Sequence, residues 1–214
     1  PNPKKRAFFE KYDLGKLREI EAKEIPYWYP PHRMMNMESD TEPWGDEWRP
    51  GRDFRTVAEL FTKRNLWALS ALLAAIRSTS EDTCRDALTF GFTSILLKAS
   101  RMMAHNRDGI GRIQKGTYYI PQIEHDINVW RFMRGAIKDL TSGYKEILVG
   151  ITGLLISTSG ARDLEIPSNS IDYIFTDPPY AGNVQYGELN FIWEAWLDFD
   201  TTWHENEIIV NQTR

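Results

Sequence analysis

The chain has 214 residues, a formal net charge of −4, 42% hydrophobic residues and 26% charged ones, which is the composition of an ordinary globular protein. No apolar run approaches the roughly 20 residues that a membrane-spanning helix needs, so we expect no membrane partner. The single cysteine, Cys84, excludes an intramolecular disulfide and a multi-cysteine zinc site within these residues. With no signal-peptide pattern after Pro1, we expect a cytoplasmic protein.

Residues 1–55 show little hydrophobic periodicity, and we interpret them as an extended arm with one short helix over 6–20. The aromatic and proline-rich run over 25–31 cannot form a regular helix. Trp44 and Trp48 interrupt an acidic stretch that follows. The alternatives are a linker or an arm that docks on another surface, and the tryptophans favour docking.

Residues 56–143 predict a helical body. Apolar residues recur at helical spacing over 57–77 and again over 81–104, which favours an antiparallel helical hairpin. Thr62 is placed to cap the main helix of the first run. A third helix is expected over 122–141.

A loop over 105–117 carries a local excess of positive charge. Between residues 98 and 115 there are five basic side chains against one acidic side chain, in a chain whose net charge is −4. Arg107, Arg112 and Lys115 are therefore candidates for contacts with DNA phosphates, since such contacts supply sequence-independent affinity. The alternative is an ordinary solvated loop.

Residues 144–214 change to short apolar runs, which predicts an α/β region. The run over 170–176 is typical of a buried strand. It ends in Asp177-Pro-Pro-Tyr180, whose prolines cannot donate to a strand ladder. A carboxylate is thus expected at the C-terminal tip of a strand, where ligands bind in open α/β sheets. An aromatic-rich helix follows over 188–197.

The Asp177-Pro-Pro-Tyr180 turn suits methylation of an exocyclic amine on a nucleic-acid base. That nitrogen is a poor nucleophile because its lone pair is delocalised into the ring. Asp177 and the carbonyl of Pro178 can accept its two N–H groups and favour a pyramidal nitrogen, while Pro179 keeps the turn rigid. The ring of Tyr180 can stack on a base flipped out of the duplex. The alternative is a plain type I turn without chemistry.

The segment Ile166-Pro-Ser-Asn-Ser-Ile-Asp-Tyr-Ile-Phe-Thr-Asp-Pro-Pro-Tyr180 resembles the catalytic motif, and the strand before it, of the N6-adenine and N4-cytosine DNA amino-methyltransferases. Further segments are similar to the large site-specific DNA methylases, some of which carry a zinc ribbon. These segments are Gly182-Asn-Val-Gln-Tyr-Gly-Glu-Leu-Asn-Phe-Ile-Trp-Glu-Ala-Trp196, Leu60-Phe-Thr-Lys-Arg-Asn-Leu66, Gly116-Thr-Tyr-Tyr-Ile-Pro121 and Asn128-Val-Trp-Arg131.

The resemblance implies a DNA methyltransferase, with adenine N6 favoured over cytosine N4, of the kind found in restriction-modification. It implies S-adenosyl-L-methionine as methyl donor, and Asp177 and Tyr180 as the residues that hold the flipped base. Asp163 falls where the family places an acidic residue near the adenosine of the donor. The implied fold is α/β and helix-rich: a helical body over 56–143, then part of a Rossmann-like methyltransferase sheet over 144–214.

The family also uses a Gly-rich loop to hold the donor, and this chain offers no good match. Asp108-Gly-Ile-Gly111 leads into an expected strand rather than from a strand into a helix, and Gly150 and Gly153 lie inside an apolar run. We therefore expect the chain to be a fragment whose donor loop belongs to the remainder of a longer parent polypeptide. Residues 1–214 alone should then bind S-adenosylmethionine weakly and be inactive.

Two other functions stay open. The same chemistry could act on RNA or on a protein side-chain amide, whose planar nitrogen poses the same problem. Alternatively the chain is a non-enzymatic helical interaction module. No metal site is predicted, because the histidines show no metal-ligand spacing; they are His32, His105, His125 and His204.

Overall fold

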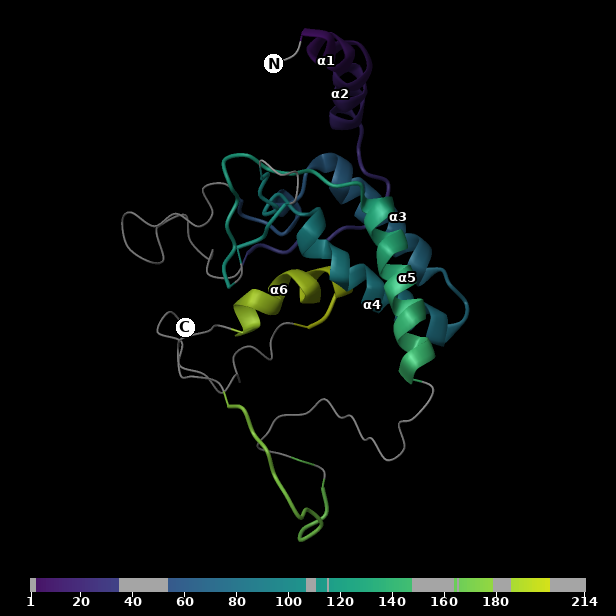
Figure 1. The fold of residues 1–214 in the computed structure, drawn as a ribbon, viewed down its shortest axis with the longest axis vertical. Coiled ribbons are helices and arrows are strands. Elements are labelled where there is room, and N and C mark those ends of the chain that lie inside the picture. Colours follow the sequence, from purple (N-terminus) through teal and green to yellow (C-terminus); the bar gives the residue numbers. More distant parts are fainter. Residues whose placement is uncertain are drawn as a thin grey trace, which may run out of the picture.

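The computed structural model describes residues 3–34, 54–106, 111–114, 116–147, 164, 166–178 and 186–200, and this part of the chain is predominantly helical (Figure 1). Its helical elements, in chain order, are α1 (Pro3–Phe8), the π-helical turn η1 (Phe9–Asp13), α2 (Leu14–Ala22), the 3-10 turn η2 (Ala58–Leu60), α3 (Lys63–Arg77), α4 (Asp82–Ala99), α5 (Val129–Ile147) and α6 (Tyr186–Leu197). None of the helices in these ranges is long and apolar enough to cross a lipid bilayer.

The predicted α/β fold class is wrong for the described residues, which contain no strand and no Rossmann-like sheet. The predicted strand over 170–176 is an extended segment whose large apolar side chains face solvent. Tyr173, Ile174 and Phe175 are 79%, 73% and 82% exposed. β-Branched and aromatic residues raise the preference for extended backbone, but a strand also needs a neighbour to complete its hydrogen bonds. No such neighbour lies among the described residues.

The N-terminal helix exceeds its predicted bounds of 6–20, because α1, η1 and α2 follow one another without interruption over 3–22. Figure 1 shows this rod, in purple, projecting from the rest of the molecule, and none of its side chains is buried. Ion pairs line its surface: Lys16 and Lys23 lie 3.0 and 2.5 Å from the carboxylate of Glu19 and lower the pKa of that group to about 2.

Residues 30–34 cross the helical body and pair with residues 54–57. The Met34 N–H donates to the carbonyl of Arg55 at 2.8 Å, and the Val57 N–H donates to the carbonyl of His32 at 3.0 Å. Met34 and Val57 are buried. The acidic stretch with Trp44 and Trp48 lies outside the described residues, so its docking stays a prediction.

The predicted hairpin is present as α3 and α4, which pack against each other. The cap at Thr62 is confirmed, since its hydroxyl oxygen accepts the Asn65 N–H at 3.3 Å. The Glu81 carboxylate caps α4 by accepting the Cys84 N–H at 2.7 Å. The two helices supply a large share of the buried core, including Leu69, Leu73, Ile76, Phe92, Ile95 and Leu96.

Helix α4 ends at Ala99, five residues before its predicted end, and α5 begins at Val129 rather than at residue 122. Both differences have one cause. Residues 103–105 and 123–125 leave the helical conformation to form an antiparallel pair of backbones, centred on a bridge between Ala104 and Glu124. Short-range periodicity cannot reveal a pairing between segments 20 residues apart.

Asn65 ties these elements together from within the core. Its Nδ2 atom donates to the carbonyl of Ala99, at 2.9 Å, and to Oδ1 of Asp126, at 2.6 Å. Asp126 also accepts from Arg64. The start of α3, the end of α4 and the segment before α5 are thus joined by a buried side chain whose amide is satisfied.

Candidate functional site

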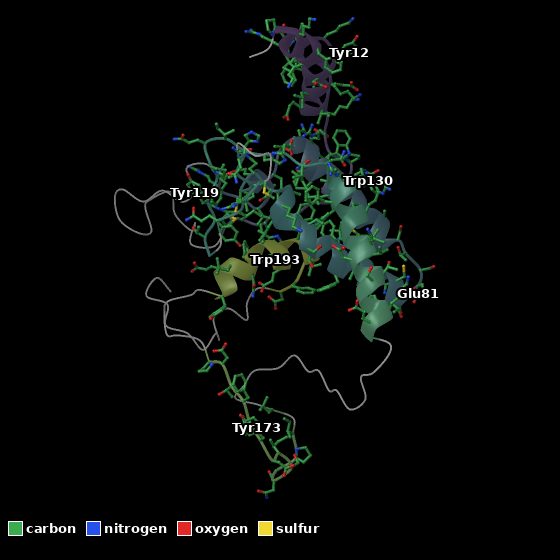
Figure 2. The ribbon with its side chains drawn as sticks, viewed as in Figure 1. Tyr12, Glu81, Tyr119, Trp130, Tyr173 and Trp193 are labelled. Atoms are coloured by element: carbon green, nitrogen blue, oxygen red, sulfur yellow. The ribbon has the colours of Figure 1, made fainter. Side chains whose placement is uncertain are left out.

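Asp177 lies near the end of the extended segment over 170–178, and both its side chain and that of Pro178 are exposed. Figure 2 shows Tyr173 on this segment, below the helices. The segment starts from a turn in which the Ser170 hydroxyl donates to the carbonyl of Pro167 at 2.7 Å. Pro179 and Tyr180, the other residues of the predicted catalytic turn, lie outside the described residues, as does Asp163.

The helix that follows the turn, α6, is held firmly on the helical body. Trp196 is fully buried and meets Phe61 and Phe92 edge to face, with ring centroids 5.5 and 5.6 Å apart. Phe191 makes a similar contact with His32 at 6.0 Å. Edge-to-face ring pairs add a directional attraction to the stabilisation from burying apolar surface. These contacts therefore fix the position of α6 against α4 and the segment around Phe61.

Hydrogen bonds fix the position of α6 along its own axis relative to the helical body. The indole N–H of Trp193 donates to the carbonyl of Thr93 in α4 at 3.0 Å, and Figure 2 shows Trp193 on the side of α6 that faces α4. The Tyr118 hydroxyl lies 2.8 and 3.1 Å from the carbonyls of Glu188 and Leu189, and accepts the Ile192 N–H at 3.3 Å. A tyrosine before α5 is thereby bonded to the backbone of α6.

The pKa of Tyr118 is raised well above the ordinary tyrosine value, because burial disfavours the phenolate. The carboxylates of Glu194 and Glu188 raise it further, while the Ile192 N–H acts in the opposite direction. The hydroxyl therefore stays protonated and can serve as the donor to α6 throughout the neutral and mildly alkaline range.

Replacing Tyr118 by phenylalanine should lower the free energy of unfolding by about 1 kcal/mol at neutral pH, because the bonds of its hydroxyl to α6 are lost. The folded pKa of Tyr118 lies above that of the unfolded chain, so its contribution to stability is complete below about pH 10 and falls as the pH rises further. Urea denaturation at several pH values should show a weaker alkaline loss in Tyr118→Phe than in the wild type. Tyr119, which is 49% exposed, gives the matched control: Tyr119→Phe should change neither quantity.

The predicted phosphate-contacting loop is only partly described, because Arg107 and Lys115 lie outside the described residues. Arg112 is present and exposed, and its backbone pairs with that of Ala104 at 2.8 and 3.3 Å. Arg101, which contributed to the local excess of charge, forms an ion pair with Glu124 at 2.9 Å. The net positive charge of this region is therefore smaller than the sequence alone indicates.

His105 and His125, which the sequence did not predict to be neighbours, lie with their Nδ1 atoms 3.3 Å apart. Their ring centroids are 5.6 Å apart and the ring planes differ by 10°, so the rings are nearly coplanar and meet edge to edge. The described residues contain no cluster of three or more His, Cys, Asp or Glu side chains suited to a metal ion. No spacing rule links two histidines 20 residues apart; the signal is the backbone pairing of 103–105 with 123–125.

The structure thus places Asp177 on an exposed segment and anchors the helix that follows it, and it pairs Arg112 with Ala104 in the segment after α4. The predicted resemblance of residues 166–180 to the DNA amino-methyltransferases stays a prediction. No family model, no curated protein and no solved structure matches this chain.

Proposed function

We propose that this chain carries the base-binding turn of a DNA amino-methyltransferase whose preferred target is the N6 amine of adenine. The observation that supports the proposal is the motif Asp177-Pro-Pro-Tyr180 with its flanking residues 166–176 and 182–196. The motif places three groups next to one another along the chain: a carboxylate, a carbonyl fixed by two prolines, and an aromatic ring. The first two can bind the target amine and the third can stack on the base.

In this proposal Asp177 accepts one N–H of the target amine and the Pro178 carbonyl accepts the other. The nitrogen lone pair is then directed at the incoming methyl group, and positive charge that develops on the nitrogen is stabilised by the carboxylate. No strong general base is required, because the amine becomes acidic once it is methylated. Tyr180 stacks on the flipped base.

S-adenosylmethionine would supply the methyl group. The one residue that the resemblance associates with this donor, Asp163, lies outside the described residues, and no described residue is assigned to it. We propose that the donor is held by the remainder of a longer polypeptide. Arg107, Arg112 and Lys115 are proposed to contact DNA phosphates.

The anchoring of α6 favours this assignment, because catalytic loops work best when a rigid element positions them. Asp177 is nine residues before Tyr186, the first residue of α6, so the chain between them can span at most about 30 Å. The position of α6 is fixed by its contacts through Trp193, Trp196 and Tyr118. These contacts therefore limit how far from the helical body the turn can hold a base.

The full-length protein, incubated with methyl-labelled S-adenosylmethionine and duplex DNA, should produce N6-methyladenine. Mass spectrometry of the nucleosides after complete digestion measures it. Raising the salt from about 50 to about 200 mM should reduce transfer strongly, since phosphate contacts release counterions. RNA of the same sequence and a protein mixture serve as parallel substrates. Label confined to RNA or to protein amides would contradict the proposed substrate, and no label in any substrate would favour an interaction module.

A further inference from the structure

The pair formed by His105 and His125 has the nitrogen–nitrogen separation of a chelating site. In a tetrahedral zinc site each ligand nitrogen lies about 2.0–2.1 Å from the metal, which places two ligand nitrogens roughly 3.3–3.4 Å apart. The two Nδ1 atoms lie 3.3 Å apart. The rings meet edge to edge, so this contact is an Nδ1–H···Nδ1 hydrogen bond in which one ring holds the proton. A bound metal ion would replace that proton, with a rotation of both rings that turns their lone pairs toward the ion.

The backbone holds the two imidazoles in this position. The His105 N–H donates to the carbonyl of Ile123 at 2.9 Å, and the His125 N–H donates to the carbonyl of Met103 at 2.7 Å. These bonds make His105 and His125 diagonal neighbours on one face of an antiparallel pair, close enough for side chains of this length to meet. The backbone therefore brings both imidazoles within reach of one ion before a metal binds, which lowers the entropic cost of binding.

The surrounding charges favour a ligand set of nitrogen rather than oxygen. The carboxylates next to His125 in sequence are engaged elsewhere: Glu124 pairs with Arg101, and Asp126 accepts from Arg64 and Asn65. Magnesium and calcium need several oxygen ligands, whereas imidazole suits zinc, nickel and copper. His105 is exposed and His125 is partly exposed, so an ion can reach both nitrogens.

We propose that Nδ1 of His105 and Nδ1 of His125 bind one divalent transition-metal ion of the zinc, nickel or copper class. The remaining coordination positions are left to water or to an external ligand. Such an ion cross-links the end of α4 to the segment that precedes α5. The site is independent of the proposed methyl transfer.

The test is calorimetric titration of the full chain, prepared without a histidine tag, with zinc chloride and nickel chloride at about pH 7.5. We expect one ion per chain and a rise in melting temperature on binding. His105→Ala and His125→Ala should each weaken binding on the order of tenfold or more, because one of the two protein ligands is lost. Lowering the pH should weaken binding in the wild type, since a proton competes for each ligand nitrogen.

His204→Ala is the matched control, since it removes one imidazole and leaves both members of the pair; it should bind zinc as the wild type does. Magnesium chloride should produce no heat of binding. If His105→Ala fails to fold, as judged by circular dichroism, His105→Gln keeps a polar side chain there and removes the imidazole. Equal zinc affinity in the wild type and in folded His105 and His125 variants would overturn the proposal, as would the absence of binding to the wild type.

Discussion

Replacing Asp177 by alanine in the full-length protein should lower the rate constant of methyl transfer by on the order of 10²–10³-fold. This is the typical loss when one preorganised group that stabilises developing charge is removed. The carboxylate is proposed to act mainly in the transition state, where positive charge grows on the amine nitrogen. The loss should therefore appear in kcat, with a much smaller change in KM for DNA. Single-turnover transfer of labelled methyl groups to duplex DNA measures both quantities.

Asp172→Ala is the matched control for this experiment. Asp172 lies on the same extended segment, is also exposed, and carries the same charge, but it lies five residues before the turn. It should retain the wild-type rate within about twofold, as expected for a surface substitution away from a special feature. If Asp177→Ala transfers methyl groups at the rate of the wild type, the catalytic role of the turn is falsified. Equal losses in both variants would indicate a general effect of charge on DNA binding.

The helices were predictable wherever a 3.6-residue apolar period coincided with a local cap. Helix α3 begins at Lys63 because Thr62 caps it, and both the period and the cap are visible in the sequence. Helix α6 was predicted from its run of aromatic and aliphatic residues alone, and Phe191 and Trp196 of that run are buried. The starting point of α5 was not predictable. The backbone groups of Ile123 and His125 bond to those of residues 103–105, and this long-range pairing overrides a helical pattern.

In the candidate site, too, the local features were predictable and the features that depend on distant residues were not. The motif at Asp177 is a local pattern, so the sequence reveals it without any structure. The sheet expected around it depends on residues distant in sequence, and residues 170–178 are extended without a neighbouring strand in the described part of the chain. The histidine pair was missed for the complementary reason. It is made by two loops that meet in space, and each histidine alone looks like an ordinary surface residue.

Replacing Trp196 by alanine should lower the free energy of unfolding by about 3–5 kcal/mol, the typical cost of deleting a large buried aromatic side chain. Trp196 has no exposed surface, and it touches Phe61 before α3 and Phe92 in α4. Its removal leaves a cavity at the point where α6 joins the helical body. Urea denaturation followed by circular dichroism measures the loss, and Trp130→Ala is the control, because Trp130 is 58% exposed and its loss should cost no more than about 0.5 kcal/mol.

Trp196→Phe tests how much of the stability lost in Trp196→Ala comes from removing the aromatic ring and how much from the indole N–H. The buried Nε1–H of Trp196 has no hydrogen-bond partner among the described residues, and an unsatisfied buried donor is itself destabilising. Phenylalanine keeps an aromatic ring between Phe61 and Phe92 and removes that donor, so we expect a loss clearly smaller than in Trp196→Ala. Equal losses in the two variants would contradict the view that packing of an aromatic ring against Phe61 and Phe92 holds α6 in place.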